Sequence, residues 1–239
     1  MTIAILAIIN FFSAFIQAAS GLGYAIFAMF FMPMIIPFNQ CSIISAAIIV
    51  VIGIQMTISL RSHIRIKKII LPMTFCIPTI WVGIYIIRVT NEHKMRMIMG
   101  VFLIFLSFYF YITNKYEVRM KDGFITSATI GLLTGLLTGM FNIVGPFLTL
   151  YYYDNCEDNL EFKANLEVSF LVAGAYSLCL NLLYVKPDAF SIKTIGVSAV
   201  GAVLAGLLGL HVFKKIDKQK LKYIIISVLP IMGLVLILK

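Results

Sequence analysis

Two short breaks containing glycine interrupt apolar segments of this sequence, and their residue types suit the binding of a ligand. The first is residues 20–23, SGLG, and the second is residues 142–146, NIVGP. Asn can cap a helix, Gly adopts backbone angles denied to other residues, and Pro suits the first turn of a helix. Lipid cannot hydrogen-bond the free backbone groups of a broken helix, so such a break must be buried in protein or line a wet cavity. The breaks therefore predict a pocket or a pathway.

We expect the helices that follow the two breaks to start close together, and such a pair of helix starts has a defined chemistry. Each offers free N–H groups and about half a positive charge, so together they favour a small anion without requiring Arg or Lys. The alternative is that the glycines only allow helices to cross closely, since Gly is common in membrane helices. The residues expected at a substrate site are Ser20, Gly21, Gly23, Tyr24, Thr138, Gly139, Asn142, Gly145, Pro146 and Lys163.

Few ionisable residues lie in or beside the apolar segments, and such residues are functional candidates by default. Glu167, two residues into the segment 166–185, is the candidate for carrying a coupling proton, although an interfacial loop carboxylate is the commoner explanation. Lys163 precedes that segment and either contacts an anion or anchors the helix at the lipid headgroups. The His and Cys residues show no metal-ligand spacing, so the sequence indicates no metal site and no cofactor.

The composition indicates a polytopic membrane protein. Of the 239 residues, 61% are hydrophobic and 12% charged, with a mean hydropathy of +1.01, whereas a soluble domain carries about 25% charged residues. The net charge of +9 comes from Lys and Arg that lie mostly in short loops, where they set orientation in the membrane. That distribution argues against a nucleic-acid partner and makes the lipid bilayer the expected one.

Ten apolar segments are expected to be helices, and they fall into two sets of five. They lie at about 3–19, 24–36, 42–60, 69–87, 97–112, 124–141, 146–153, 166–185, 194–212 and 223–238. Segments 24–36 and 146–153 are too short to cross a membrane core, which needs about 20 helical residues. At a shift of 126 positions, Lys67 meets Lys193 and Gly83 meets Gly209. The sequence therefore predicts a first repeat at 1–113, a connector at 114–123 and a second repeat at 124–239.

Basic residues distinguish two arrangements of the short paired segments. If each broken pair enters and returns, the loops 61–68, 114–123, 154–164 and 213–222 share one face and hold 13 Lys and Arg, against 6 on the opposite face. If each pair makes one net crossing, the split is 10 to 9 and orients nothing. The first arrangement is favoured. It predicts an all-α protein of two inverted repeats, each a broken or re-entrant helix pair followed by three transmembrane helices, with both termini outside.

The break segments resemble a known family. FIQAASGLGYAIFAMFFMP and GLLTGMFNIVGPFLTLYYY are similar to the paired signature segments of the sulfite exporter TauE/SafE family, and the resemblance continues through FKANLEVSFLVAG to the C-terminus. The chain departs from the family pattern at Asn142 and Val144, where the family usually has Gly, and at Lys163, where it often has Arg. The resemblance implies movement of sulfite, sulfonates or related organic acids across the cytoplasmic (inner) membrane.

These observations predict a secondary transporter that moves a small anion by rocking one repeat against the other. The sequence has no GxxxxGK[ST] motif, so coupling to a proton or sodium gradient is expected rather than ATP hydrolysis. An enzyme is not expected, because the chain lacks an HExxH helix and an intramembrane Asp pair. A transporter of a short carboxylate and a non-transporting accessory subunit of a larger complex stay open, as do the direction of transport and the oligomeric state.

Overall fold

The computed structural model describes residues 1–21, 23–116, 120–213 and 218–238, and every regular element in those ranges is helical. The elements are α1 Thr2–Ser20, α2 Tyr24–Phe31, η1 Met32–Met34, α3 Phe38–Ser59, η2 Arg61–His63, α4 Ile66–Val89, α5 Glu92–Lys115, α6 Phe124–Phe141, α7 Gly145–Asn155, α8 Asn159–Tyr184, α9 Ala189–Phe213 and α10 Lys218–Leu238. Seven of the described helices, α1, α3, α4, α5, α6, α8 and α9, are long and apolar enough to cross a membrane. The all-α membrane architecture is confirmed.

The surface of the bundle is suited to lipid. Large apolar side chains are exposed along several helices, and they include Ile8, Phe12, Ile54, Ile58, Val101, Phe105, Phe108, Leu204 and Leu207. A soluble protein seldom exposes so much contiguous apolar surface. Many polar side chains of these helices are, by contrast, buried inside the protein, and they include Asn10, Gln17, Ser42, Asn165 and Ser177.

Local sequence explains several helix ends. Asn91 begins α5, because its side chain accepts a hydrogen bond from the Lys94 N–H at 2.8 Å. Asp158 begins α8 in the same way and accepts from the N–H groups of Leu160 and Glu161. The start of α8 at Asn159 differs from the apolar segment 166–185, because a hydropathy pattern misses polar helical residues that are buried in protein. That difference moves Lys163 and Glu167 from a helix end into the helix.

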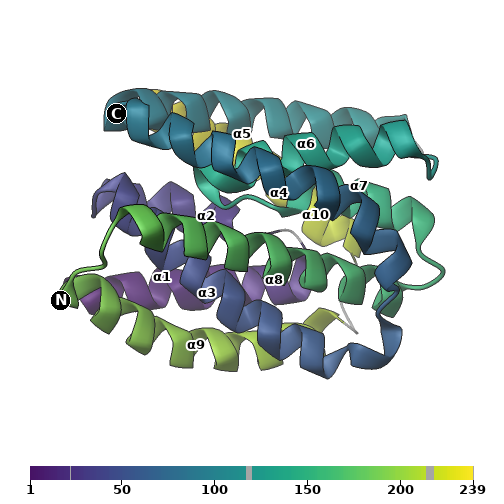
Figure 1. Ribbon diagram of the computed structural model, residues 1–239, viewed down its shortest axis with the longest axis horizontal. Helices are drawn as coiled ribbons and strands as arrows, with labels where there is room; N and C mark the ends of the chain where they lie inside the picture. The colour runs from purple at the N-terminus through teal and green to yellow at the C-terminus, as the bar shows by residue number, and fades with distance from the viewer. Residues whose placement is uncertain (22, 117–119, 214–217, 239) are drawn as a thin grey trace.

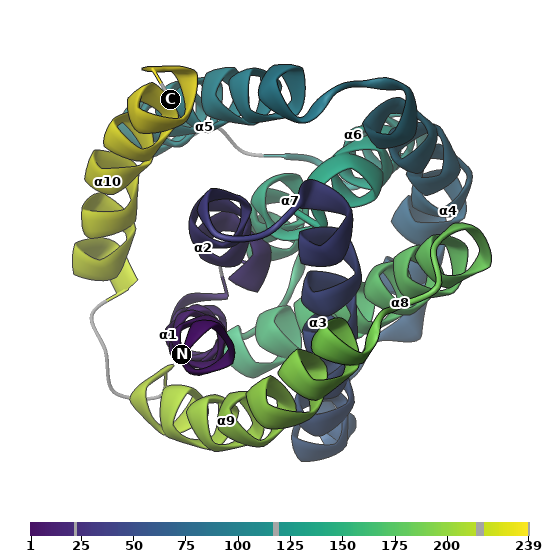
Figure 2. The same ribbon diagram turned by 90° about the vertical axis from the view of Figure 1, so that its left-hand side faces the viewer.

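The two halves of the chain pack in a symmetric pattern. Helix α1 lies against α9 as α6 lies against α4, while α3 pairs with α8 and α5 with α10. If α1–α5 correspond to α6–α10 in order, the α1–α9 contact is equivalent to the α6–α4 contact. The α3–α8 and α5–α10 contacts are then each equivalent to themselves. Figure 2 shows the two short helices, α2 and α7, near the middle of this arrangement, with longer helices around them. The pattern supports an internal duplication, whose boundaries at 113 and 124 stay a prediction.

Two glycines make the correspondence specific. A Cβ on Gly83 of α4 would meet Leu136 O, Gly139 Cα and Met140 N of α6. A Cβ on Gly209 of α9 would meet the atoms of α1 at the equivalent offsets, which belong to Phe15, Ala18 and Ala19. Gly83 therefore lets α4 approach α6, and Gly209 lets α9 approach α1, the counterpart pair in the other half. The sequence match of Gly83 with Gly209 suggests this equivalence.

The seam between α4 and α6 depends on three further glycines. An added Cβ on Gly131, Gly135 or Gly139 would collide with the carbonyl oxygens of Pro72, Cys76 and Ile80, respectively. Their spacing of four residues puts all three on one face of α6. This face of α6 is therefore a packing seam against α4.

One end of the bundle gathers the turn after α3, the connector between the halves and the turn after α7. The Arg65 N–H donates to Asn165 Oδ1 at 2.8 Å, and the Met120 N–H donates to Asp154 Oδ2 at 2.6 Å. Lys68 Nζ donates to the carbonyl of Asn155, the last residue of α7, at 2.6 Å. Residues from the loops 61–68, 114–123 and 154–164 thus lie together, as they would if each broken pair entered and returned.

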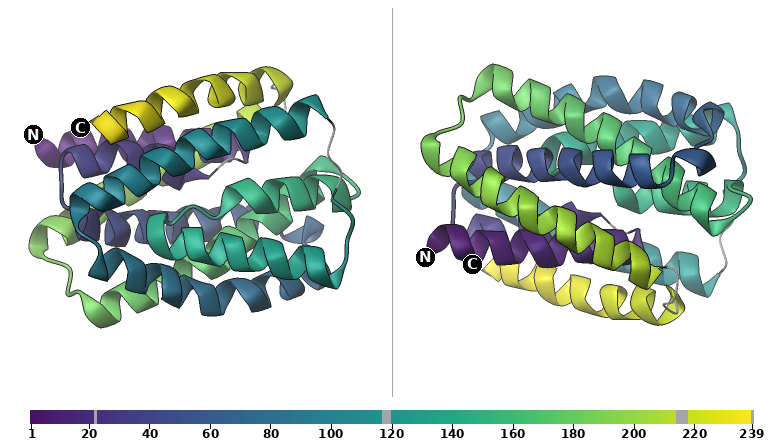
Figure 3. Two further views of the ribbon diagram at one scale, coloured as in Figure 1. Left: turned by 90° about the horizontal axis from the view of Figure 1, so that it is seen from above. Right: turned by 90° about the horizontal axis from the view of Figure 1, so that it is seen from below.

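The opposite end gathers the starts of α3, α5 and α9. The Phe38 N–H donates to Glu92 Oε1 at 3.4 Å, and Gln40 Nε2 donates to Asp188 Oδ2 at 3.1 Å. The first turn of α1 and the last turn of α10 lie at this same end (Figure 1, Figure 3). An arrangement with one net crossing per pair would separate loop 154–164 from loop 61–68, which the contacts above bring together.

Candidate functional site

Both breaks use a left-handed residue to end a helix. Gly21 has φ 75° and ends α1, with its N–H donating to Gln17 O at 2.9 Å. Asn142 has φ 56° and ends α6, with its N–H donating to Thr138 O at 2.8 Å. Asn is one of the few residues other than Gly that tolerates this conformation. The helix that Asn142 caps is therefore the one before the break, and Val144 stands at the cap position of α7.

The starts of α2 and α7 meet. A Cβ added to Gly145 would lie 3.0 Å from the backbone nitrogen of Gly23, and one added to Gly23 would lie 3.7 Å from the nitrogen of Gly145. Both glycines are buried, as is Pro146 in the first turn of α7. The expectation that the two helix starts come together is confirmed, and the absence of side chains at both positions is what permits the approach.

A small pocket lies at this meeting point. It contains about 150 Å³ of space between atoms and draws on α1, α2, α3, α8 and the second break. The space is divided too finely to hold a water molecule, so the pocket must widen before an oxyanion can enter. Its lining residues come from both halves of the chain and are Gln17, Gly23, Tyr24, Ala25, Ile49, Asn142, Val144 and Phe170.

Tyr24 connects the start of α2 to two other helices. Its backbone N–H donates to Gln17 Oε1 of α1 at 2.9 Å, and its hydroxyl donates to Asn10 Oδ1, also of α1. Asn10 Nδ2 in turn donates to Ser198 Oγ of α9 at 2.9 Å. All these side chains are buried, so the start of α2 is fixed by a polar chain that runs across the bundle.

The side chain of Asn142 ties the second break to the other half. Its Nδ2 donates to the carbonyl of Ser42 in α3 at 2.9 Å, and its Oδ1 accepts from Ser177 Oγ of α8 at 2.7 Å. Asn181, one turn along α8, donates to the Ser177 carbonyl at 2.9 Å. Asn142 thus both ends α6 and holds the break against α3 and α8.

Lys163 and Glu167 form an ion pair inside the protein. Lys163 Nζ lies 2.7 Å from Glu167 Oε1, and both side chains are 0% exposed. Lys163 also donates to the Gln17 carbonyl at 2.7 Å, and Gln17 Nε2 donates to Glu167 Oε2 at 2.9 Å. The interfacial explanation for Glu167 and the headgroup explanation for Lys163 are therefore wrong. The pair instead joins α8 to the last turn of α1, directly before the first break.

Comparison with protein families agrees with this geometry. The sequence pattern of the sulfite exporter TauE/SafE family matches residues 6–236, which include both breaks and nearly the whole chain. The chain belongs to the sulfite exporter TauE/SafE family. Comparisons with curated proteins and with solved structures gave no match. Membership in this exporter family, together with the seven apolar helices, makes this a multi-pass membrane protein and supports a transporter.

Three of the expected site residues of this TauE/SafE protein make contacts within their own helix or with a neighbouring helix. Ser20 Oγ donates to the Ile16 carbonyl at 2.6 Å, and Thr138 Oγ1 donates to the Thr134 carbonyl at 2.7 Å. Gly139 faces α4 in the glycine seam. Ser20 begins the first break and Thr138 and Gly139 precede the second, whereas Gly23, Tyr24 and Asn142 line the pocket itself.

Several buried polar residues at the TauE/SafE site were not expected from the sequence. They are uncharged, whereas the search of the apolar segments considered ionisable side chains. A usable signal was present, because Asn10 and Gln17 are seven residues apart and so share one face of α1. The unexpected residues are Asn10, Gln17, Ser42, Ser177, Asn181 and Ser198.

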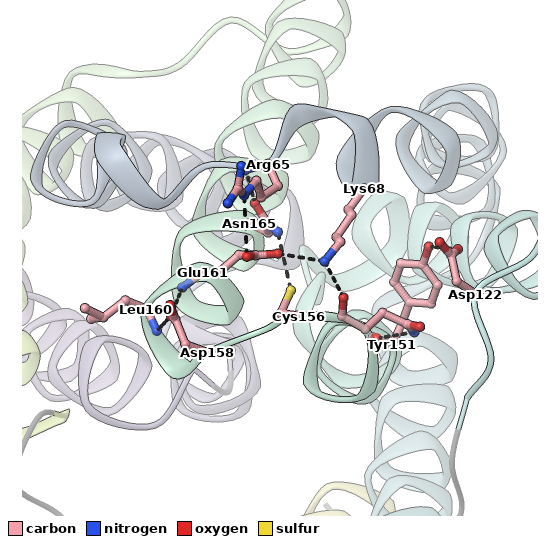
Figure 4. Close-up of polar contacts among 10 residues, drawn as sticks. Arg65, Lys68, Asp122, Tyr151, Cys156, Asp158, Leu160, Glu161 and Asn165 are labelled. Carbon is pink, nitrogen blue, oxygen red and sulfur yellow. Dashed lines mark hydrogen bonds and ion pairs between the residues drawn. The ribbon is translucent and has the colours of Figure 1, made fainter.

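A second polar cluster closes one end of the TauE/SafE bundle, and Figure 4 shows it. Glu161 of α8 pairs with Lys68 at 2.8 Å and with Arg65 at 3.6 Å. Asn165 Nδ2 donates to Cys156 Sγ at 3.4 Å, and burial raises the pKa of the Cys156 thiol to about 11. The cluster joins the two halves of the chain at the end that carries the basic loops.

Within the described residues, no group of three His, Cys, Asp or Glu side chains is placed to hold a metal ion. The chemistry that the described site offers is therefore hydrogen bonding by backbone and amide groups, beside one buried ion pair.

Proposed function

We propose that this protein is a secondary transporter that carries sulfite, a sulfonate or a related small organic acid across the cytoplasmic membrane by alternating access. The observation that carries the proposal is the meeting of the α2 and α7 starts at Gly23 and Gly145, inside a buried pocket. Helix starts attract anions through their free N–H groups and the positive end of the helix dipole. Here two of them point at one place.

The charge balance supports backbone recognition of the anion. Lys163 and Glu167 neutralise each other, so the ion pair contributes no net positive charge near the pocket. Neither Gly23 nor Val144, the cap residues of α2 and α7, makes a side-chain cap hydrogen bond. The Tyr24 N–H already donates to Gln17 Oε1, so an anion would use the other backbone donors of the two helix starts unless that contact is released. The pocket must also widen to admit the anion.

Alternating access is supported by polar contacts between the halves at both ends. One end is joined by Lys68 and Arg65 with Glu161. The other is joined by Gln40 with Asp188 and by Arg88, whose guanidinium lies 4.1 Å from the ring centre of Tyr184. Each set can break without the other when one half rocks against the other. That is what opening a central site to one side at a time requires.

Uptake by proteoliposomes that contain the purified chain alone tests the proposal. Time-dependent, saturable sulfite uptake above the level of protein-free liposomes is expected. An accessory subunit of a larger complex would move nothing, and that result would refute the proposal. Competition should rank sulfite, sulfoacetate and lactate above taurine and a small amine. A clear preference for the amine would also contradict it.

A short carboxylate is the second candidate substrate. Asn142 and Val144 lie at the pocket, and both depart from the Gly that the resemblance to the family leads one to expect there. Because these substitutions change the pocket itself, the same competition series decides between lactate and the sulfur oxyanions.

A further inference from the structure

Gln17 joins the buried ion pair to the first N–H of α2. Its Nε2 donates to Glu167 Oε2 at 2.9 Å, while its Oε1 accepts from the Tyr24 N–H at 2.9 Å. An ionised carboxylate can only accept hydrogen bonds. Glu167 therefore fixes the amide with its nitrogen toward α8 and its oxygen toward α2. In this orientation an internal oxygen occupies a donor at the start of α2, where an incoming anion would bind.

The buried charges impose a second constraint. Lys163 and Glu167 are fully buried, and together they carry no net charge. An anion that entered alone would add an uncompensated negative charge, and a proton that entered alone would leave Lys163 without a counter-charge. Either state is costly in a low-dielectric interior. A proton and a monoanion that enter together leave the net charge at zero.

We propose that Glu167 binds the coupling proton and that Gln17 transmits its protonation to the anion pocket. This inference rests on the proposed function and specifies how the same site couples transport to a proton gradient. When Glu167 takes up a proton, its new O–H can donate to Gln17 Oε1. The amide then turns over, its Nε2 faces the pocket, and the Tyr24 N–H is released. The pocket gains two donors at the moment when the net charge allows an anion to enter.

The cycle balances with one O–H bond formed and broken. A proton from the aqueous phase on one side binds a Glu167 oxygen, and an anion binds at the start of α2. After the halves rock, both leave on the other side, and Glu167 accepts again from Gln17 while pairing with Lys163. Lys163 keeps its charge throughout, and one proton moves with each anion. No oxidant, reductant or nucleotide takes part.

Lys163 is the charged group that contacts Glu167 among the described residues. The titratable side chains of the surrounding helices have other contacts. His211 of α9 is exposed, and Phe213 of that helix places its ring 5.3 Å from Lys163 Nζ. The remaining groups and their neighbours are Tyr24 with Asn10, Cys41 with the Ile36 carbonyl, Cys76 in the seam with Gly135, Tyr152 with Ser169, and Arg65 and Lys68 with Glu161.

Anion affinity measured against pH tests the inference directly. Methanesulfonate is the probe, because its single charge stays constant over the range, whereas sulfite itself titrates. Proton and anion binding must strengthen each other equally. Affinity of the wild-type chain should therefore fall as pH rises, by up to about tenfold per unit where Glu167 loses its proton. Affinity that does not change with pH would overturn the inference while leaving an anion transporter in place.

The variant Glu167→Gln imitates the protonated state, because a neutral amide can donate to Gln17. It should bind methanesulfonate at high pH as tightly as the wild type does at low pH, with no pH dependence. In proteoliposomes it should exchange internal for external anion but lose accumulation driven by a pH gradient. Glu157→Gln, the same change at an exposed carboxylate in the turn before α8, should keep the wild-type pH dependence. A Glu167→Gln variant that also keeps it would contradict the inference.

Gln17→Met separates the relay from the ion pair, since Met has a similar length but lacks the amide. At low pH it should bind methanesulfonate more weakly than the wild type, because the Nε2 donor is missing. Its affinity should also change less with pH, because only the direct charge coupling between Glu167 and the anion is left. If it follows the wild-type pH curve, Gln17 does not transmit protonation and the proposal fails in that form. If the wild-type chain binds neither methanesulfonate nor any anion of the competition series, the proposed function fails first and this inference fails with it.

Discussion

Gly145→Ala tests whether the meeting of the two helix starts is a binding site or only a packing contact. The added Cβ would lie 3.0 Å from the backbone nitrogen of Gly23 and 3.3 Å from Phe170 Cζ. The first contact is tighter than ordinary van der Waals contact and involves backbone, so the start of α2 must move by a few tenths of an ångström. Overpacking of this kind costs about 1–3 kcal/mol.

That cost should appear in binding. An anion held by both helix starts needs their geometry undisturbed, and about 1.4 kcal/mol corresponds to a tenfold change in affinity. We expect Gly145→Ala to bind sulfite about tenfold more weakly or worse, as measured by isothermal titration on monodisperse protein. Its melting temperature should fall less than that of Gly131→Ala, whose Cβ would collide with the Pro72 carbonyl in the α4–α6 seam.

Two matched variants make the comparison decisive. Gly131→Ala should lower folded yield and melting temperature while the folded fraction binds normally. Gly196→Ala on α9, where an added Cβ meets nothing within 4 Å, should change neither quantity. If Gly145→Ala melts early yet binds sulfite normally while folded, the break is architectural and the site lies elsewhere.

Three further predictions concern single residues. Lys163→Met should destabilise the fold by about 3–5 kcal/mol in thermal or chemical unfolding, because it leaves a buried carboxylate unpaired. Adding Glu167→Gln should recover much of that loss. Equal stability of the single and double variants would contradict this expectation. Asn142→Gly should fold better than Asn142→Ala by about 1–2 kcal/mol, since only glycine adopts the left-handed backbone without cost, and the reverse order would contradict the role of Asn142 in ending α6. With the other cysteines replaced, Cys156 should react with an impermeant maleimide from the cytoplasmic side only. The labelling rate should rise about tenfold per pH unit up to the thiol pKa of about 11. Ready labelling from outside intact cells would overturn the predicted orientation.

The breaks and the seam could be predicted from sequence because they depend on glycine and proline, whose backbone properties are local. The four-residue spacing of Gly131, Gly135 and Gly139 specifies a helix face whatever the partner helix is. Of the four basic loops expected on one face, 61–68, 114–123 and 154–164 contact one another, whereas 213–222 includes residues 214–217, which lie outside the described residues. These features belong to the chain itself.

The buried polar network could not be predicted because it depends on neighbours distant in sequence. Glu167 and Gln17 are separated by 150 positions, and hydropathy treats Lys163 as the edge of an apolar segment. Only the start of α8 at Asn159 places Lys163 and Glu167 one turn apart inside a helix, facing α1. Polar residues whose hydrogen bonds come from neighbouring helices are taken for the ends of apolar segments until those neighbours are known.

The position of a bound anion is the most direct test of the central claim. Selenite, the selenium counterpart of sulfite, can be located by its anomalous scattering in crystals of the wild-type protein. The account predicts a peak between the starts of α2 and α7, within hydrogen-bond distance of the backbone at Gly23 and Gly145. A peak at Arg65 and Lys68, with none between the two helix starts, would contradict it.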